Sequence, residues 1–175
     1  LDDGSIVLVE MQVLPVEAFV QRVIYNTAKA YTNQLQRGQG YIFLKPVIAL
    51  TITDFILFED SDSPLSRYQL LEPGTGRLCS DHLELIFAEL PKFHKLAQDL
   101  GSLTDQWLYF LQQAGRLETI PAALHNNPDF DAAFAIANES QLSQEELQLF
   151  QKQQLKLLDE QGRMSYALRK GREEG

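Results

Sequence analysis

The fold of this chain is decided by one stretch near its N-terminus, Ser5-Ile6-Val7-Leu8-Val9-Glu10-Met11-Gln12-Val13. Branched apolar residues dominate the stretch, and it follows Asp3-Gly4, a pair typical of turns, so it predicts a β-strand. Side chains alternate across a strand, which puts Glu10 and Gln12 on one face, at the end of an otherwise apolar run. A buried carboxylate without a partner costs several kcal/mol. Glu10 therefore either faces water at a sheet margin or belongs to a metal or catalytic site.

Length and composition predict one globular core with a helical appendage. The chain has 175 residues, of which 45% are hydrophobic. Its single cysteine, Cys79, excludes an internal disulfide framework and a CxxC metal site. No apolar run is long enough to cross a bilayer, so we expect a cytoplasmic protein with no membrane partner. A strand directly after an Asp-Gly turn usually has a hairpin partner in front of it. We therefore expect the chain to be a fragment trimmed at its N-terminus.

The charge of the chain is unevenly distributed. The formal net charge is −9, which argues against a generic polyanion-binding protein. Residues 1–58 hold five acids and four bases, a balance of −1, whereas the remainder holds nineteen acids and eleven bases, a balance of −8. Any contact with nucleic acid is therefore expected on the first third of the chain.

A βαβ unit follows from the pattern of the next forty or so residues. Apolar residues recur at three- and four-residue steps, which predicts an amphipathic helix over residues 16–37 that ends at Gly38. Residues 47–52, Val-Ile-Ala-Leu-Thr-Ile, then form a second apolar strand, covered on both faces. A strand, a helix and a strand over this span predict two parallel strands with a right-handed crossover. The expected fold class is α/β with a mixed sheet.

The remaining segments predict antiparallel strands followed by helices. Residues 55–58 either extend the second strand or begin an edge strand. We expect antiparallel strands over 67–71, 77–79 and 82–90, and helices over 92–100, 104–114, 119–125 and 128–138. Ser143-Gln144-Glu145-Glu146 has the pattern of a capping box and predicts one long polar helix after it. The predicted regions are a sheet domain over 1–100, a helical cap over 101–141 and a polar helical tail over 142–175.

One further pair of side chains resembles metal ligands. His82 and Glu84 share a face of the predicted strand 82–90. No third ligand type lies nearby in the sequence, so a structural role is the simpler interpretation.

Several motifs together resemble the PD-(D/E)XK nuclease family of transposases and recombination-promoting nucleases. They are Val9-Glu10-Met11-Gln12, Arg22, Tyr25 and Tyr31 on the predicted helix, Gly40-Tyr41, and Lys45-Pro46-Val47-Ile48. Residues 84–95, Glu-Leu-Ile-Phe-Ala-Glu-Leu-Pro-Lys-Phe-His-Lys, resemble the family's strand and the Leu-Pro-Lys-Phe segment after it. The end of the chain, Arg-Lys-Gly-Arg-Glu-Glu-Gly, resembles the family's charged tail. The resemblance implies a restriction-endonuclease-like mixed sheet.

The resemblance also implies a metal-dependent DNA endonuclease linked to transposition or recombination. Such nucleases hold a divalent ion, usually Mg²⁺, between two carboxylates and a backbone carbonyl. Carried over to this sequence, Glu10 is the metal-binding acid and the Met11 carbonyl is the backbone ligand. Gln12 stands where the superfamily more often has a lysine, so the catalytic site lacks one cation. Arg22, Tyr25 or Lys29 is expected to compensate for that charge or to contact DNA.

The N-terminal end of the chain differs from the family pattern. The family's other acid belongs to a strand before the Asp3-Gly4 turn, and Asp2 and Asp3 lie too far from Glu10 to replace it. We therefore expect the chain to bind metal poorly and to cleave little or no DNA. The alternative is a non-catalytic interaction module, derived from the nuclease fold, whose helical half and tail mediate self-association. The missing hairpin partner also leaves unpaired backbone groups on one side of the strand 6–13, through which we expect the chain to form a homodimer.

Overall fold

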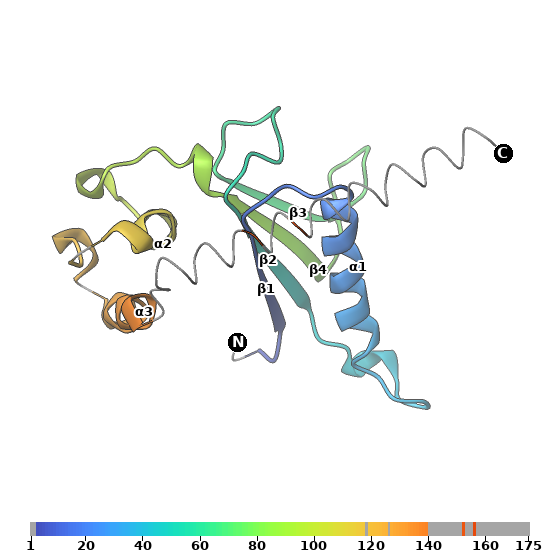
Figure 1. Cartoon of the computed structure of the whole chain (residues 1–175). Coiled ribbons are helices and arrows are strands. Elements are labelled where there is room, and N and C mark those ends of the chain that lie inside the picture. The colour runs from blue at the N-terminus through green and yellow to red at the C-terminus, as the bar shows by residue number, and fades with distance from the viewer. Residues whose placement is uncertain (1–2, 118, 126, 140–151, 153–155, 157–175) are drawn as a thin grey trace. The chain divides into compact units, whose positions relative to one another are not determined.

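A four-stranded mixed sheet lies at the centre of the fold (Figure 1). The computed structural model describes residues 3–117, 119–125, 127–139, 152 and 156. The strands are β1 (Ile6–Gln12), β2 (Val47–Thr53), β3 (Leu65–Leu71) and β4 (Leu78–Glu89), in the spatial order β1-β2-β4-β3. Strand β2 runs parallel to both β1 and β4, and β3 runs antiparallel to β4. The predicted α/β class, with a restriction-endonuclease-like mixed sheet and parallel strands in a βαβ unit, is confirmed.

Helix α1 (Phe19–Thr32) connects β1 to β2 and covers one face of the sheet. Its buried Phe19 and Val23 pack against Ala49 of β2 and Phe87 of β4. The helix is shorter than the predicted span of residues 16–37. It begins only after Ala18, which has a left-handed φ of 57°. It ends near Thr32 because the chain then turns into a loop that leads back to β2.

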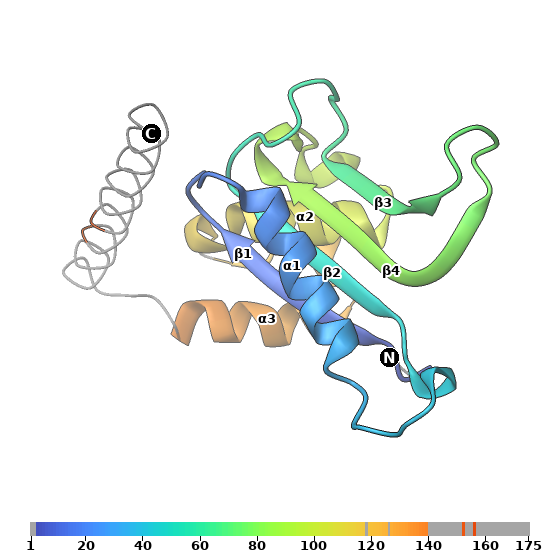
Figure 2. The same ribbon diagram turned by 90° about the vertical axis from the view of Figure 1, so that its right-hand side faces the viewer.

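Helix α2 (Leu103–Gln113) covers the other face of the sheet (Figure 2). Its Leu108 packs with Ile52 of β2, Ala88 of β4 and Phe93. The helix begins with a capping box, in which the Ser102 side chain accepts from the Asp105 N–H and the Asp105 side chain accepts from the Ser102 N–H. Two apolar cores, one on each side, thus sandwich β2 and β4, and β2 is covered on both faces as predicted.

Several predicted elements differ from the observed ones. The predicted strands 77–79 and 82–90 are parts of one longer strand, β4 (Leu78–Glu89). Residues 55–58 are not a strand, because the Glu89 carboxylate takes the N–H groups of Leu57 and Phe58, at 2.5 and 3.0 Å. Residues 92–100 and 119–125 contain only short 3-10 turns, Ala97–Asp99 and Ala122–Leu124.

The first of these missing helices has a clear cause. Pro91 lies in the 3-10 turn Leu90–Lys92, and Phe93 and Leu96 have extended backbone angles. The Gln112 side chain donates to the carbonyls of Leu90 and Phe93, at 2.9 and 3.1 Å. The carbonyls of Leu90 and Phe93 thus accept hydrogen bonds from a side chain of α2. In an α-helix, they would accept from main-chain N–H groups four residues later.

The chain divides into two compact units, Leu1–Asn126 and Asn127–Gly175. The second unit contains α3 (Pro128–Glu139), which confirms the helix predicted over 128–138. Its first turn is held by the Asn127 side chain, which accepts from the Asp129 N–H at 3.0 Å, and Phe130 is fully buried. The long helix predicted after residue 143 lies outside the described residues. Within the described part of the chain, no helix is long and apolar enough to span a membrane.

Candidate nuclease site

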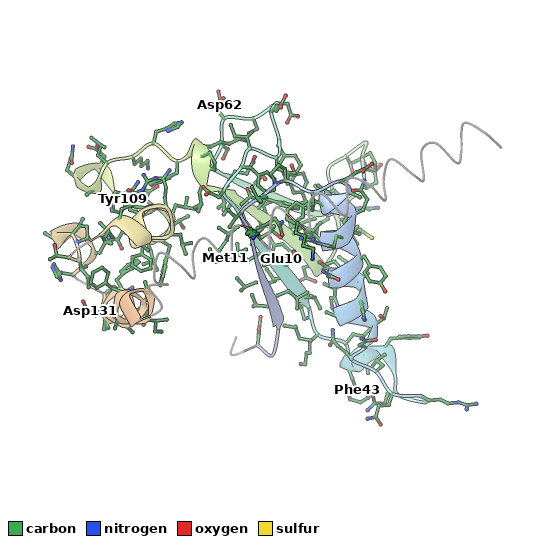
Figure 3. All side chains as sticks on the ribbon, in the orientation of Figure 1. Glu10, Met11, Phe43, Asp62, Tyr109 and Asp131 are labelled. Atoms are coloured by element: carbon green, nitrogen blue, oxygen red, sulfur yellow. The ribbon has the colours of Figure 1, made fainter. Side chains whose placement is uncertain are left out.

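Glu10 and Gln12 meet the first turns of α1 through a single residue, Arg22. Arg22 Nη2 donates to Glu10 Oε1 at 2.5 Å and to Gln12 Oε1 at 2.9 Å. Figure 3 shows Glu10 and Met11 on β1, the edge strand that leads into α1. The prediction that Glu10 and Gln12 share a strand face is confirmed, and the face is the one that α1 covers.

The packing around Arg22 holds its guanidinium in place. The guanidinium carbon lies 5.0 Å from the centre of the Phe19 ring, a distance at which a cation and an aromatic face attract each other. Arg22 Nε is buried and has no hydrogen-bond partner among the described residues. The side chains of Arg22 and Glu10 are 38% and 31% exposed, so the pair is accessible to a ligand from solvent. Arg22 therefore retains an unused donor beside the carboxylate.

Both the oxygen and the nitrogen of the Gln12 side-chain amide form hydrogen bonds within the protein. Its Oε1 accepts from Arg22, and its Nε2 donates to the Leu14 carbonyl at 2.8 Å. None of the hydrogen bonds described for this amide joins it to Glu10. The cation beside Gln12 is the guanidinium of Arg22, which comes from α1.

The main chain of β1 presents the Met11 carbonyl at an open edge. The Ile6 N–H donates to the Pro46 carbonyl and the Gln12 carbonyl accepts from the Asp54 N–H, so these even-numbered residues bond toward β2. In a parallel pair, the peptide groups of the intervening residues point the other way. Met11 and Val9 therefore direct their N–H and C=O groups away from β2. Within residues 3–117, no strand pairs with that edge.

A pocket of about 470 Å³ lies next to Glu10. Residues of β1, α1 and β2 line it together, among them Glu10, Asn26 of α1 and the buried Thr51 of β2. Asn26 was not singled out from the sequence. The available signal was its position one helical turn after Arg22, which places both side chains on the same face of α1.

The other two predicted site residues lie farther along α1. Tyr25 is 63% exposed and Lys29 is also exposed. Among the hydrogen bonds and ion pairs described for residues 3–117, none joins either side chain to Glu10 or Gln12. Their roles as DNA contacts remain predictions.

The donor atoms near Glu10 suit a hard cation. Glu10 Oε1 is taken by Arg22, but its second oxygen, Oε2, has no hydrogen bond recorded within the described residues. Mg²⁺ usually binds proteins through one or two carboxylates and keeps several of its waters. Glu10 Oε2 and the Met11 carbonyl fit that pattern. In the described part of the chain, no three His, Cys, Asp or Glu side chains form a complete metal site.

Asp3 has a different role, as expected from its position in the turn. Its carboxylate accepts from the Ser5 N–H at 2.8 Å, and this hydrogen bond lowers the pKa of Asp3 below its ordinary value. Asp3 and Glu10 are seven positions apart in the sequence, which corresponds to about 23 Å of extended chain. Asp3 therefore cannot share an ion with Glu10.

The structural interpretation of His82 and Glu84 on β4 agrees with their contacts, because the two side chains have separate structural partners. His82 Nδ1 lies 2.9 Å from the Tyr31 hydroxyl on α1, and Glu84 forms an ion pair with Arg67 on β3. Each contact joins β4 to a neighbouring element.

A buried ion pair was missed in the sequence. Glu89 Oε2 and Lys92 Nζ lie 2.8 Å apart with side chains 1% and 6% exposed. Lys92 also donates to the Phe58 carbonyl at 2.6 Å, and Glu89 accepts from the two N–H groups named above. The pair therefore fastens the loop after β2 to the end of β4. Two opposite charges three residues apart within Phe87-Ala88-Glu89-Leu90-Pro91-Lys92-Phe93 were the signal for it.

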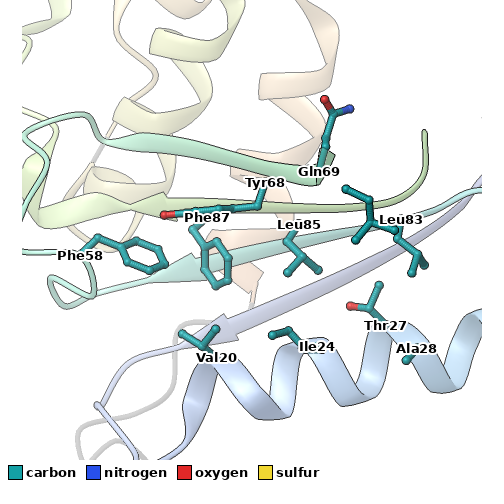
Figure 4. Close-up of a pocket in the computed structure, with 11 residues that line it drawn as sticks. Val20, Ile24, Thr27, Ala28, Phe58, Tyr68, Gln69, Leu83, Leu85 and Phe87 are labelled. Carbon is teal, nitrogen blue, oxygen red and sulfur yellow. The ribbon is translucent and has the colours of Figure 1, made fainter. Parts of the chain in front are cut away.

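A second pocket is not suited to the same chemistry. It measures about 360 Å³ and lies between α1 and the strands β3 and β4 (Figure 4). Val20, Ile24 and Ala28 of the helix face Leu83, Leu85 and Phe87 of β4 across it. The residues that line it include no carboxylate, histidine or lysine, so it offers no group for phosphodiester hydrolysis.

Comparison with known proteins assigns the family. The chain belongs to the PD-(D/E)XK nuclease family transposases, whose family model matches residues 1–167. No curated protein and no solved structure matched the chain. The assignment agrees with the mixed sheet and with the place of Glu10 on the strand before the crossover helix, and it supports a function related to nuclease activity and transposition.

Proposed function

We propose that this chain provides the core of a metal-dependent DNA endonuclease that hydrolyses phosphodiester bonds in transposition or recombination. The observation that carries the proposal is the contact of one Arg22 nitrogen with both Glu10 and Gln12. It gathers a carboxylate, an amide and a cation at the end of a strand, next to an outward-facing carbonyl. The family assignment supports the same reaction class.

Each residue of the cluster has a distinct role in this proposal. Glu10 Oε2 and the Met11 carbonyl would hold Mg²⁺, which supplies Lewis-acid activation of the phosphate and of an attacking water. Arg22 offsets the negative charge that develops on the phosphate oxygens, as a lysine does where the superfamily has one at the position of Gln12. Guanidinium groups suit this role because they stay charged and donate strong hydrogen bonds to phosphate oxygens.

The exposed face of α1 offers further contacts to DNA. Tyr25 and Lys29 follow Arg22 by three and seven residues, so all three lie along one side of the helix. We propose that Lys29 contacts a backbone phosphate and that Tyr25 contacts the sugar-phosphate chain beside it. Such contacts position the duplex without reading its sequence.

A second carboxylate is needed beside Glu10 for full activity. Glu10 is the one carboxylate in the cluster, and Mg²⁺-dependent nucleases of this family are expected to use two. We propose that the second comes from a strand paired with the open edge of β1, where the Met11 carbonyl points. The described residues on their own are then expected to cleave DNA slowly.

A plasmid-nicking assay of the full-length protein tests the proposal. Supercoiled plasmid is incubated with the protein and Mg²⁺, and a parallel reaction contains EDTA. Conversion to nicked and linear forms only in the Mg²⁺ reaction is expected. Equal conversion in both reactions, or none at any protein concentration, would contradict metal-dependent cleavage.

The open edge of β1 favours a second candidate function, a self-association module. Val7, Val9 and Met11 are 42%, 63% and 60% exposed, and their peptide groups point away from the sheet. Apolar edge strands pair readily with other strands. In this alternative two copies form a homodimer by joining their β1 strands, and Glu10 has no catalytic role.

A further inference from the structure

The loop between α1 and β2 carries an unusually exposed apolar tip. We name Tyr41, Ile42 and Phe43 the aromatic tip; their side chains are 83%, 89% and 67% exposed. Figures 1 and 2 show this loop extending beyond the end of α1, and Figure 3 places Phe43 at that extremity, away from Glu10. Single exposed apolar residues are common, but three consecutive ones with two aromatic rings indicate a contact surface.

Hydrogen bonds hold the loop in a defined shape. The Gln34 amide and the Lys45 main chain exchange two bonds, at 2.9 and 2.8 Å. The Gln36 N–H donates to Gln39 Oε1 at 2.7 Å. The tip itself is a 3-10 turn, closed by bonds from the Phe43 and Leu44 N–H groups to the carbonyls of Gly40 and Tyr41. The aromatic tip therefore lies on a hydrogen-bonded turn with a defined conformation.

The charge around the loop is the reverse of the charge of the whole protein. Residues 18–53 contain no aspartate or glutamate and four bases, a balance of +4, in a chain whose net charge is −9. The four bases are Arg22, Lys29, Arg37 and Lys45. In the sequence, Arg37 precedes the aromatic tip by four residues and Lys45 follows it by two. A basic, acid-free segment that includes exposed aromatic rings combines the two features by which proteins bind single-stranded nucleic acid.

We propose that the aromatic tip binds unpaired nucleotides of the DNA substrate, with Tyr41 and Phe43 stacked on bases and Arg37 and Lys45 beside the phosphates. The proposal rests on the proposed nuclease function and adds a substrate class to it, namely DNA with unpaired bases near the cleavage point. Unpaired bases are required because base faces in a continuous duplex are already stacked on one another.

The strands give the distance between this contact and the cleavage site. Pro46, at the end of the loop, is bonded to Ile6, which lies four residues before Glu10 on β1. Four residues of a strand span about 13 Å, which corresponds to about four nucleotides along one DNA strand. Because the aromatic tip lies beyond Pro46, the unpaired bases are expected at least that far from the scissile phosphate.

Binding of a fluorescein-labelled oligo(dT) single strand in EDTA buffer, followed by anisotropy, tests the proposal independently of cleavage. The double variant Tyr41→Ala/Phe43→Ala removes both rings and should weaken binding about tenfold or more. Tyr41→Phe/Phe43→Tyr keeps two rings and should retain the wild-type affinity. Leu96→Ala changes an exposed apolar residue elsewhere and should have no effect. Because the tip is exposed, circular dichroism should report the same fold for every variant.

Salt dependence separates stacking from charge. Arg37→Gln should reduce the slope of log affinity against log salt by about 0.7, the amount for one phosphate contact on a single strand. Tyr41→Ala/Phe43→Ala should lower the affinity without changing that slope.

Three outcomes would overturn the proposal. They are unchanged oligo(dT) binding by Tyr41→Ala/Phe43→Ala, an equal loss of binding to fully paired duplex, and a change in oligomeric state with DNA binding intact. The last would identify the aromatic tip as a protein contact. Loss of cleavage in Glu10→Gln with no effect of the tip variants would leave the nuclease proposal standing alone. If the protein did not cleave DNA but bound oligo(dT) in a way that required the two aromatic rings, the proposal for the aromatic tip would stand without the nuclease proposal.

Discussion

Arg22 and Glu10, which are twelve residues apart on a helix and a strand, form an ion pair with a distance of 2.5 Å between Nη2 and Oε1. The same nitrogen also reaches Gln12. The crossover from β1 into α1 brings these groups together, because it returns the first turns of the helix over the end of the strand. The candidate site therefore has a guanidinium from the helix, whereas the strand contributes a carboxylate and an amide.

Replacement of Glu10 by glutamine tests the role of its carboxylate. Glu10→Gln keeps the shape and removes the charge, so Mg²⁺-dependent nicking by the full-length protein should fall about a hundredfold or more, since loss of one catalytic stabilising group typically costs about 2.7–4 kcal/mol. The free energy of unfolding should change by less than about 1 kcal/mol, because the pair is partly exposed. Gln12→Ala should reduce nicking less. Full activity of purified Glu10→Gln would end the catalytic assignment.

A charge exchange between helix and strand tests whether Arg22 replaces the missing lysine. Arg22→Gln removes the cation and should lower the nicking rate about tenfold or more, as expected for a charged group that stabilises the transition state. Gln12→Lys added to Arg22→Gln returns a cation to the same cluster and should recover part of the loss. The control is Arg77→Gln, which removes an exposed cation from the segment between β3 and β4. If Gln12→Lys gave no recovery while the fold was intact, Arg22 would have a structural role only.

The buried pair of Glu89 and Lys92 should be important for stability. Lys92→Met leaves the Glu89 carboxylate buried without its cation, which should lower the free energy of unfolding by about 3–5 kcal/mol. Urea unfolding followed by circular dichroism measures the difference. Lys95→Met, in a far more exposed pair, is the matched control and should cost much less. Similar losses in the two variants would contradict a special role for the buried pair.

The open edge of β1 should make this chain self-associate at high concentration. A lysine in place of the exposed Val9 puts a charge on that edge and should shift the population toward monomer in light scattering. Leu71→Lys makes the same change on β3, the strand at the opposite edge of the sheet, and should leave the association unchanged. A wild-type chain that stays monomeric at all concentrations would exclude the homodimer.

The capping of α2 should depend on pH through Asp105. The Lys95 ammonium, 2.8 Å from Asp105 Oδ2, lowers the pKa of Asp105 below its ordinary value of 3.8, with further hydrogen bonds from Gly101 and Ser102. Because the folded-state pKa is lowered, the stabilisation is present above the ordinary value and is lost as the pH falls through the folded-state value. Asp105→Asn should therefore be less stable than wild type at neutral pH, with a difference that shrinks in acid. Ser102→Ala, which removes a group that does not titrate, should lose about 1 kcal/mol at either pH. A constant difference for Asp105→Asn would contradict the charge-based account.

Local patterns predicted the elements whose contacts are local. The alternation in β1, the apolar run of β2 and the helical spacing of α1, α2 and α3 each appeared in the sequence, and each element is present. Predictions failed where distant side chains take over main-chain groups. Glu89 holds the N–H groups of Leu57 and Phe58, and Gln112 holds the carbonyls of Leu90 and Phe93, so neither segment forms the predicted strand or helix.

The same distinction between local and long-range contacts applies to the candidate site. The sequence by itself determined that Glu10 and Gln12 share one face of β1 and that β1 and β2 are parallel, because side-chain alternation and the βαβ crossover are properties of the local chain. It did not determine which helix residue meets them, since Arg22, Tyr25 and Lys29 all lie on the same helix. Only the tertiary structure shows that Arg22 is the residue that meets them. The start of α1 at Phe19, and the packing of Phe19 and Val23 onto β2 and β4, fix the rotation of the helix over Glu10. That rotation depends on contacts between residues far apart in the chain, and no local pattern encodes it.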